Sequence, residues 1–388
     1  MRITKTALHA LRLEMVNPLK TARGTYAARE GFVVRLEDEE GRVGQGEAMP
    51  LEEFGTESPG DCERALSQLL VTLRTSTKNI SSNNTPPNNT PLPPGEGRGE
   101  GISAPGLDPC LLPLPLGEGW GEGFPTRTPA ARHAVEQALL DLLAQRRGLP
   151  LSQLLSSDAR TNLHVNALLG AASPQTLAEE ARRAVAEGYE TLKLKVAGRP
   201  LAEDVARLSA VRNAVGTTIR LRVDANGAWT EPEARAALEA LGRYELELCE
   251  QPVAPENPEA LARLGEHSPC PLAADEALSL PEATQHILNH PGTVKILVLK
   301  PMVLGGLIPT LKLAREAASR GMAAYVTSSL DGVIARAGAA HLAAALPSGS
   351  YASGLGVGHL FKDEPGNHPF RPVRGRIQLP RTPGLGVN

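Results

Sequence analysis

The second half of the chain alternates between two kinds of hydrophobic pattern. Short runs rich in apolar and β-branched residues are followed by alanine- and leucine-rich segments of helical character, and Gly, Pro or Asp bounds each pair. The runs occupy residues 162–169, 190–196, 219–225, 246–250, 271–275, 294–300, 322–328 and, more weakly, 351–357. Strands that alternate with helices form parallel sheets, and about eight units in about 230 residues predict an α/β fold of the TIM-like (β/α)8 barrel type.

An open, doubly wound sheet is the main alternative to the barrel. Its usual glycine fingerprint is missing after the first strand, however, and polar residues recur at nearly every strand end rather than at one switch point. Both features favour the barrel.

The first half of the chain has a different pattern. Residues 31–50 alternate apolar and polar side chains about a Glu-Glu-Gly turn, which predicts a β-hairpin, and residues 131–148 carry apolar side chains at helical spacing. Residues from about 76 to 126 are instead rich in Asn, Thr, Pro and Gly and contain an internal repeat, PLPPGEGRGEG followed by PLPLGEGWGEG. We expect this segment to be a disordered low-complexity insertion, because it offers too little apolar surface to offset the entropy of ordering.

Composition removes several classes of function. The 388 residues are 41% hydrophobic and carry a net charge of -3, so no basic surface for nucleic acid or an anionic membrane is expected. The first residues lack a signal-type apolar run, and no segment approaches the length of a membrane helix, which predicts a cytoplasmic protein. The four cysteines form no C-x-x-C pair, which argues against zinc or disulfide chemistry.

Charged residues end five consecutive strand runs, about 25 to 30 residues apart, the length of one βα unit. These residues are Lys195, Asp224, Glu250, Asp275 and Lys300. Taken singly, an acid here could cap a helix, and a lysine pair such as Lys193 and Lys195 could lie on an exposed edge strand. At this regular spacing all five side chains should converge at the mouth of the barrel, where barrel active sites lie.

Three carboxylates that converge at one point require protonation or a bound cation. Because no Cys or His belongs to the set, Asp224, Glu250 and Asp275 suit Mg²⁺, or Mn²⁺, better than Zn²⁺. A metal and a second ammonium, that of Lys193, would lower the pKa of Lys195 towards working pH, so that it can act as a base. This chemistry is removal of a proton α to the carboxylate of a small-molecule substrate, with Lys300 approaching from across the barrel.

The same residues resemble the motifs of the enolase superfamily, in particular its muconate-lactonizing-enzyme-like subgroup. The motifs are K-x-K (Lys193, Lys195), D-x-N (Asp224, Asn226), E-Q-P (Glu250, Gln251, Pro252) and D-E (Asp275, Glu276). The resemblance implies the Lys bases and Mg²⁺ of that superfamily, and it implies that Asn226, Glu276 and Arg222 lie near the substrate or behind the metal ligands.

The resemblance also implies the domain organisation. We expect an α+β capping domain built from the N-terminal region, residues 1–125, and from the C-terminal tail, residues 356–388. Residues 127–355 would form the catalytic barrel. Residues 18–31 resemble the mobile cap loop of these enzymes, and residues 46–58 the segment after the first hairpin.

Within the subgroup, residues 299–306 (LKPMVLGG) and 327–332 (TSSLDG) are most similar to o-succinylbenzoate synthases of menaquinone biosynthesis. That similarity implies dehydration of 2-succinyl-6-hydroxy-2,4-cyclohexadiene-1-carboxylate to 2-succinylbenzoate. By analogy Lys195 removes the α-proton and then protonates the leaving hydroxyl, while Lys300 stabilises the enediolate as a cation. Ser328 and Ser329 would hydrogen-bond a substrate carboxylate.

Two alternatives stay open at this point. Dipeptide epimerases and N-succinylamino acid racemases use the same two lysines as opposed bases, although the D-x-D pattern of the epimerases is absent near the eighth run, where GLGVGHLF stands. A non-catalytic binding protein on the same barrel is the alternative from a different class, and the intact set of acids and lysines argues against it.

Overall fold

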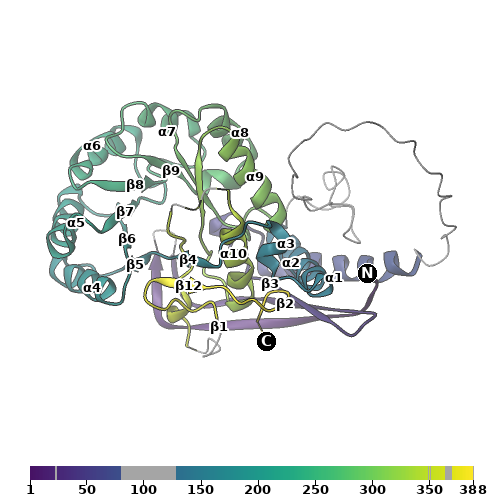
Figure 1. Ribbon diagram of the computed structural model, residues 1–388. Coiled ribbons are helices and arrows are strands. Elements are labelled where there is room, and N and C mark those ends of the chain that lie inside the picture. Colours follow the sequence, from purple (N-terminus) through teal and green to yellow (C-terminus); the bar gives the residue numbers. More distant parts are fainter. Residues whose placement is uncertain (22–23, 80–127, 348, 350, 363–368, 388) are drawn as a thin grey trace, which may run out of the picture.

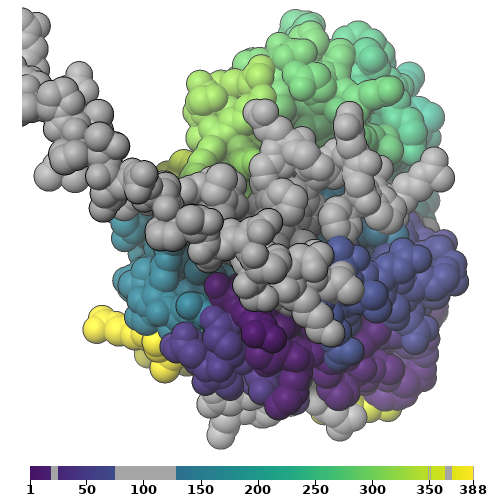
Figure 2. Space-filling model, turned by 90° about the vertical axis from the view of Figure 1, so that its right-hand side faces the viewer, coloured from purple at the N-terminus to yellow at the C-terminus, as the bar shows by residue number. Residues whose placement is uncertain are grey.

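The computed structural model describes residues 1–21, 24–79, 128–347, 349, 351–362 and 369–387. Within these residues the chain forms a three-stranded antiparallel sheet with helices beside it, followed by a parallel sheet of seven strands. Figure 1 shows the helices α4 to α9 on the outer side of the curved parallel sheet, and Figure 2 shows the N-terminal strands at the opposite end of the molecule from the green barrel helices. In the described part of the chain, no helix combines the length and the apolar character needed to cross a membrane.

The parallel sheet follows the alternation in the sequence closely. Its strands are β5 (Ala167–Leu169), β6 (Thr191–Lys195), β7 (Arg220–Asp224), β8 (Leu246–Glu250), β9 (Leu272–Ala274), β10 (Ile296–Leu299) and β11 (Ala323–Val326). The helices that follow them are α4 (Pro174–Ala186), α5 (Leu201–Val215), α6 (Glu231–Gly242), α7 (Pro258–Gly265), α8 (Pro281–Asn289), α9 (Leu307–Ser319) and α10 (Val333–Ala345). Each strand pairs with the next in parallel, which confirms the predicted α/β barrel.

The expectation of an eighth strand is wrong, because residues 351–357 form no strand. Ser353 instead makes an isolated parallel bridge to Val165, and Gly354 makes one to Thr327. A Cβ on Gly354 would lie 2.3 Å from the Thr327 hydroxyl oxygen, so only glycine lets the two backbones approach this closely. The first run is also divided, since β4 (Asn162–His164) leaves the barrel to pair with β12 (Arg376–Gln378).

The barrel interior is filled by alternate strand residues. Its apolar layer consists of Leu248, Ala273, Ile296, Val298 and Tyr325, all nearly fully buried. Successive strand side chains point to opposite faces, so the residue two places after each of Leu248, Ala273 and Val298 shares this face. Those residues are Glu250, Asp275 and Lys300. The charged groups therefore lie one layer above the apolar interior, at the carboxyl ends of the strands.

The capping domain is built on a β-meander. β1 (Ile3–Thr21), β2 (Gly24–Asp38) and β3 (Val43–Ala48) pair in that order, and the predicted hairpin is formed by β2 and β3. Helices α1 (Pro59–Asn79) and α2 (Pro129–Arg147) lie beside this sheet, and the short α3 (Leu151–Leu155) follows. The expected division at residues 125–127 assigns α2 to the barrel, but α2 packs on the capping sheet and is grouped with it. α2 packs directly on β3, because a Cβ on Gly46 would lie 1.8 Å from a carbonyl oxygen of the helix. The predicted helix at 131–148 is thus confirmed.

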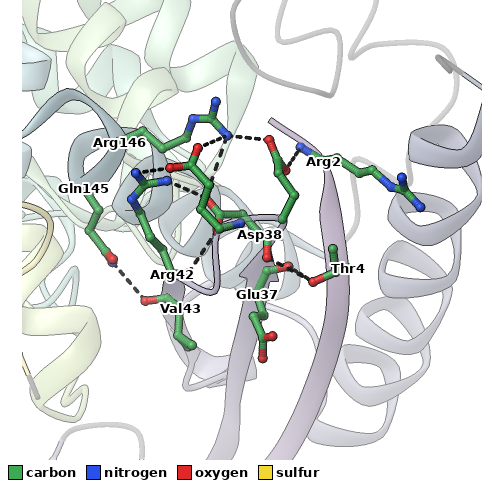
Figure 3. A network of polar contacts seen from close by, with 10 residues as sticks. Arg2, Thr4, Glu37, Asp38, Arg42, Val43, Gln145 and Arg146 are labelled. Carbon is green, nitrogen blue, oxygen red and sulfur yellow. Dashed lines mark hydrogen bonds and ion pairs between the residues drawn. The ribbon is translucent and has the colours of Figure 1, made fainter.

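A cluster of charged residues fixes the β2–β3 turn to the end of α2 (Figure 3). We call Asp38, Glu39, Glu40, Arg42 and Arg146 the turn cluster. The buried Asp38 carboxylate accepts hydrogen bonds from the backbone N–H groups of Glu40 and Arg42 at 2.9 and 3.0 Å. Arg146, in the last turn of α2, forms an ion pair with Glu39 at 2.8 Å. The side chains other than Asp38 are partly exposed.

Two buried carboxylates of the capping domain cap helices of the barrel. Glu47 on β3 accepts the backbone N–H groups of Gly332 and Ile334, at the start of α10, at 2.6 and 3.2 Å. Glu136 on α2 accepts those of Leu307 and Ile308, at the start of α9. Burial raises the pKa of each carboxyl to about 7. The capping domain therefore supplies the acceptors that these helix ends need.

Glycines in the segments LKPMVLGG and TSSLDG make this capping possible. A Cβ on Gly306 would lie 2.2 Å from a Glu136 carboxylate oxygen, and one on Gly332 would lie 2.7 Å from a Glu47 oxygen. Gly306 also has a φ of 144°, which side-chain-bearing residues rarely adopt. Both motifs thus carry residues required at the interface of the two domains.

The C-terminal tail returns to both domains. Phe361 bridges Met15 of β1, β12 pairs with β4, and the backbone N–H of Leu385 donates to Asp141 of α2 at 2.8 Å. The predicted insertion at about 76–126 lies outside the described residues from residue 80 onwards, while its first residues continue helix α1 to Asn79. The helix thus extends a few residues past the approximate start at residue 76, and the expectation of disorder for the rest of the segment stays a prediction.

Candidate active site

Strand β6 brings both lysines of the K-x-K motif into the barrel mouth. Lys193 lies opposite Arg222 and Lys195 opposite Asp224 in the register of β6 and β7, so all four share the inner face. Both lysines line a cavity of about 620 Å³. The three predicted metal ligands and Lys300 line the same cavity, so the structure brings together all six predicted catalytic and metal-binding side chains.

The three carboxylates are buried and each contacts an ammonium group. Lys193 Nζ lies 2.9 Å from an Asp224 oxygen and 2.6 Å from Glu250 Oε1. Lys300 Nζ lies 2.5 Å from Asp275 Oδ2. Such pairs are required in a buried site, because an uncompensated charge there is strongly unfavourable.

Lys195 differs from the other two lysines of the mouth. Within the described residues its ammonium group has no hydrogen-bond or ion-pair partner, whereas Arg207 on α5 holds its carbonyl oxygen at 2.9 Å. Burial lowers the pKa of Lys195, and the charges of Lys193 and Lys300 add to this effect while Asp224 opposes it. Lys195 is therefore the side chain of the mouth that most easily becomes a neutral base.

The pKa values of the two paired lysines, Lys193 and Lys300, are raised instead. Burial alone would lower the pKa of Lys193 and Lys300, but Asp224 and Glu250 raise the first and Asp275 raises the second. Both remain cations.

Two motif residues hold the carboxylates in place through unusual backbone conformations. Asn226, with a φ of 47°, donates from Nδ2 to Asp224 at 3.3 Å and to Glu276 at 3.0 Å. Gln251, with a φ of 37°, accepts the backbone N–H of Asp275 at 3.0 Å. Such left-handed conformations are costly and cluster at functional sites. Glu276 therefore lies behind Asn226, outside the cavity wall.

Arg222 lies beneath the cavity rather than in its wall. Its Nε donates to Glu247 at 2.5 Å, and its guanidinium carbon lies 4.5 Å from the ring centre of Tyr325. Tyr325 in turn donates its hydroxyl to Glu250 Oε2 at 2.7 Å. The sequence does not predict Tyr325, Gln251 or Arg207 as site residues, although Gln251 belongs to the E-Q-P motif.

The upper wall of the cavity comes from both domains. Ser328 and Ser329 line it, and their hydroxyl oxygens are buried without a hydrogen-bond partner in the described structure. Phe54 and Pro18 of the capping domain also line the wall, and Lys300 Nζ lies 5.1 Å from the Phe54 ring centre. Arg199, on the loop after β6, completes this wall with a side chain that is 31% exposed.

The donor set suits a hard divalent cation. As the side chains stand, no three Asp, Glu, His or Cys groups of the described residues are arranged to hold one ion. The ammonium of Lys193 lies between Asp224 and Glu250, and that of Lys300 lies against Asp275. Three buried carboxylates that each contact an ammonium group, with no His or Cys among them, fit Mg²⁺ or Mn²⁺ by their chemistry.

The comparisons with known proteins begin with the barrel. Residues 176–388 match the family described as enolase C-terminal domain-like. The whole chain is 28% identical to the N-succinyl-L-Arg/Lys racemase of Bacillus cereus, of which it covers 95%. Muconate cycloisomerase 1 of Pseudomonas putida is 32% identical over 66% of this chain and 68% of its own. The o-succinylbenzoate synthase of Thermobifida fusca is 36% identical over 57% of this chain and 68% of its own.

Solved structures match the full length of the chain. A substrate-liganded L-Ala-D/L-Glu epimerase from Bacillus subtilis has a TM-score of 0.81 at 27% identity, with 100% of this chain and 98% of that chain covered. A dipeptide epimerase from Enterococcus faecalis, complexed with Mg and L-Leu-L-Tyr, has a TM-score of 0.78 at 26% identity and covers 100% and 99%. Racemases and epimerases are thus matched over more of the chain than the synthase is.

Proposed function

Because this chain belongs to the enolase superfamily and to its muconate-lactonizing-enzyme subgroup, we propose that it removes a proton α to the carboxylate of a small-molecule acid, with Lys195 as the base. The observation that carries this proposal is the inequality of the lysines. Lys195 has no partner within the described residues, whereas Lys193 and Lys300 form ion pairs with the carboxylates.

Asp224, Glu250 and Asp275 would hold the Mg²⁺ ion. The ion, when bound, supplies electrostatic stabilisation for the negative charge that develops on the substrate carboxylate. The protein's own groups supply the proton transfer. Lys195 ends β6 and Lys300 directly follows β10, and three strands of the sheet lie between them, so they approach a substrate in the mouth from opposite sides.

The cavity wall indicates a substrate with a second negative group. Among the described residues that line the cavity, the three proposed metal ligands are the only carboxylates. At the eighth run the wall is formed by Gly354, Gly356 and Val357, so no acid there could bind a free ammonium group. The unpartnered hydroxyls of Ser328 and Ser329 are available to a substrate carboxylate, and the partly exposed Arg199, which pairs with Asp204 at 3.4 Å, adds positive charge to the wall. A succinyl arm fits this chemistry better than a dipeptide does.

We propose dehydration of 2-succinyl-6-hydroxy-2,4-cyclohexadiene-1-carboxylate, the o-succinylbenzoate synthase reaction, as the first candidate. Lys195 takes the α-proton, and the resulting ammonium returns a proton to the departing hydroxyl, which leaves as water. Lys300 remains a cation near the substrate carboxylate. One base and one cation match the unequal lysines of the mouth.

Racemisation of an N-succinylamino acid is the second candidate. The comparisons favour it, because the racemase and epimerase relatives match the whole chain. Its substrate shares both the acidic α-carbon and the succinyl arm, but the reaction requires Lys195 and Lys300 to act as bases in turn.

The test compares both reactions in wild type, Lys195→Ala and Lys300→Arg. We expect Mg²⁺-dependent dehydration in wild type, a loss of about 100- to 10,000-fold in Lys195→Ala, and residual activity in Lys300→Arg, which keeps the cation. Deuterium exchange into each enantiomer of N-succinylamino acids is measured in parallel. Stereospecific exchange in each single variant, together with no dehydration by wild type, would replace the synthase with the racemase. Turnover that persists after complete removal of divalent metal would overturn both.

A further inference from the structure

Tyr325 on β11 is a large polar side chain in the apolar layer of the barrel. It is 2% exposed, and its neighbours in that layer are Leu248, Ala273, Ile296 and Val298. A buried phenol requires an acceptor for its hydroxyl. Its acceptor is Glu250 Oε2, at 2.7 Å, across two intervening strands of the sheet.

The two oxygens of Glu250 therefore have different environments. Oε2 accepts from Tyr325 below, whereas Oε1 faces the cavity and contacts Lys193 Nζ at 2.6 Å. A carboxylate with one oxygen fixed from beneath can rotate little about its last torsion. Oε1 is thereby directed to the place where the other carboxylates converge.

Arg222 fixes the ring of Tyr325 in turn. Its guanidinium lies 4.5 Å from the ring centre, and it is fully buried. Glu247 and the carbonyl oxygen of Ala352 hold the guanidinium at 2.5 and 2.8 Å. The pairing of β7 with β8 shifts register beside Glu247, which lets this residue join the inner layer. The ring is thus clamped from below and cannot move away from Glu250.

We propose that Tyr325 is a positioning residue for Glu250, and that its hydroxyl sets the affinity of the barrel mouth for a divalent cation. The inference rests on the proposed function in one respect, the assignment of Glu250 as a metal ligand. Partners of this kind orient metal ligands, and their removal typically weakens metal binding by about 10- to 100-fold.

Tyr351 offers a matched control. It faces the same guanidinium, at 5.7 Å, and its ring centre lies 6.3 Å from that of Tyr325. Its hydroxyl, unlike that of Tyr325, has no hydrogen-bond partner within the described residues. The two tyrosines therefore share their aromatic surroundings and differ in the contact with Glu250.

The experiment titrates purified wild type, Tyr325→Phe and Tyr351→Phe with Mn²⁺ in the absence of substrate and follows free Mn²⁺ by electron paramagnetic resonance. We expect Tyr325→Phe to bind Mn²⁺ about tenfold or more weakly, and Tyr351→Phe to stay within about twofold of wild type. Melting temperatures with and without Mn²⁺ give a second readout, in which Tyr325→Phe should gain less from the metal than Tyr351→Phe does.

Three outcomes would count against the inference. Equal Mn²⁺ affinity in Tyr325→Phe and wild type would show that the hydroxyl does not position Glu250. If Tyr325→Phe lowers the melting temperature but leaves the Mn²⁺ affinity unchanged, Tyr325 has only a structural role. Failure of the wild type to bind Mn²⁺, with Glu250→Gln indistinguishable from it, would instead remove the metal site on which the proposed function depends.

Discussion

The turn cluster and the barrel mouth contain the same kinds of charged residue in opposite surroundings. In the turn cluster, Arg146 and Glu39 are 28% and 37% exposed, and they pair at 2.8 Å. In the mouth, Lys193 and Glu250 are 13% and 1% exposed, and they pair at 2.6 Å. The distances are similar, but water screens the first pair and is nearly absent around the second.

The difference shows that burial, rather than contact distance, decides what an ion pair does. Exposed pairs contribute about 0 to 1 kcal/mol, because solvent already stabilises each partner. A buried pair contributes little over an apolar replacement of both groups, yet removing one partner typically costs about 3 to 5 kcal/mol. Charges in the mouth are therefore costly to keep there, which is typical of sites retained for function.

The largest effect should follow from breaking the buried pair. Lys193→Met removes the ion-pair partner of both Asp224 and Glu250, so we expect the metal-free free energy of unfolding to fall by about 3 to 5 kcal/mol. Added Mg²⁺ should restore part of it, since the ion replaces the missing charge. Urea denaturation in a chelator and in Mg²⁺ measures both changes.

Lys195→Met is the control for this prediction, because Lys195 lies on the same strand and face but has no partner within the described residues. We expect the metal-free stability of Lys195→Met to equal or exceed that of wild type, since a buried, unpaired ammonium is removed. Similar losses in both variants would mean that the pairing of Lys193 is not what stabilises the mouth.

Glu136 represents a third environment, because this buried carboxylate is held by the N-terminus of helix α9 and not by a cation. Burial raises the pKa of Glu136 to about 7 from 4.5, so the folded state binds the proton more tightly than the unfolded state. Its stabilising contribution is complete below about pH 4.5 and is lost as the pH rises through 7. Relative to wild type, Glu136→Gln should therefore gain up to about 3 kcal/mol of stability between pH 4.5 and 7.5.

Paired urea denaturation curves of wild type and Glu136→Gln across that pH range test the prediction. Glu39→Gln in the turn cluster is the control with a pKa shift in the opposite direction, because Arg146 pairs with Glu39 and lowers the pKa of Glu39 to about 2. A constant stability difference between Glu136→Gln and wild type at all pH values would contradict the assignment of a raised pKa to Glu136.

The smallest effect is expected in the turn cluster itself. Arg146→Ala removes a partly exposed ion pair with Glu39 at the end of α2, and should lower the free energy of unfolding by about 1 kcal/mol or less. Turnover should not change. The loss should shrink further at high salt, which distinguishes it from the buried pairs. A loss above about 2 kcal/mol would show that Asp38, buried in the same cluster, depends on Arg146 for its charge balance.

The barrel and its charged mouth could be predicted because their signals are local. Strand alternation places Lys193 and Lys195 on one face, and a fixed spacing places Asp224, Glu250 and Asp275 at successive strand ends. The same reasoning could not identify Tyr325 as a partner of Glu250. Nothing in the run MAAYVTS indicates which strand faces it across a closed barrel.

Two elements were missed for other physical reasons. Strand β1 is long, but of its described side chains only Ile3 and Met15 are buried, and apolar and polar residues alternate only over the short stretch LRLEM, residues 11–15. That stretch is too short a signal to predict the whole strand. The eighth run reads weakly because its glycines give no side-chain pattern, and the structure uses Gly354 for a close backbone contact rather than for a strand. The partners of Glu47 and Glu136 were invisible because they lie in the other domain.

The capping of barrel helices by carboxylates of the other domain has a consequence for the order in which the molecule is made. Glu47 meets the backbone of Gly332 across 285 positions, and Glu136 meets that of Leu307 across 171. During synthesis both acids emerge long before the helices that they cap. Contacts of such long range form late and slow folding, so the first half of the chain should gain its final stability only when the last barrel helices have been added.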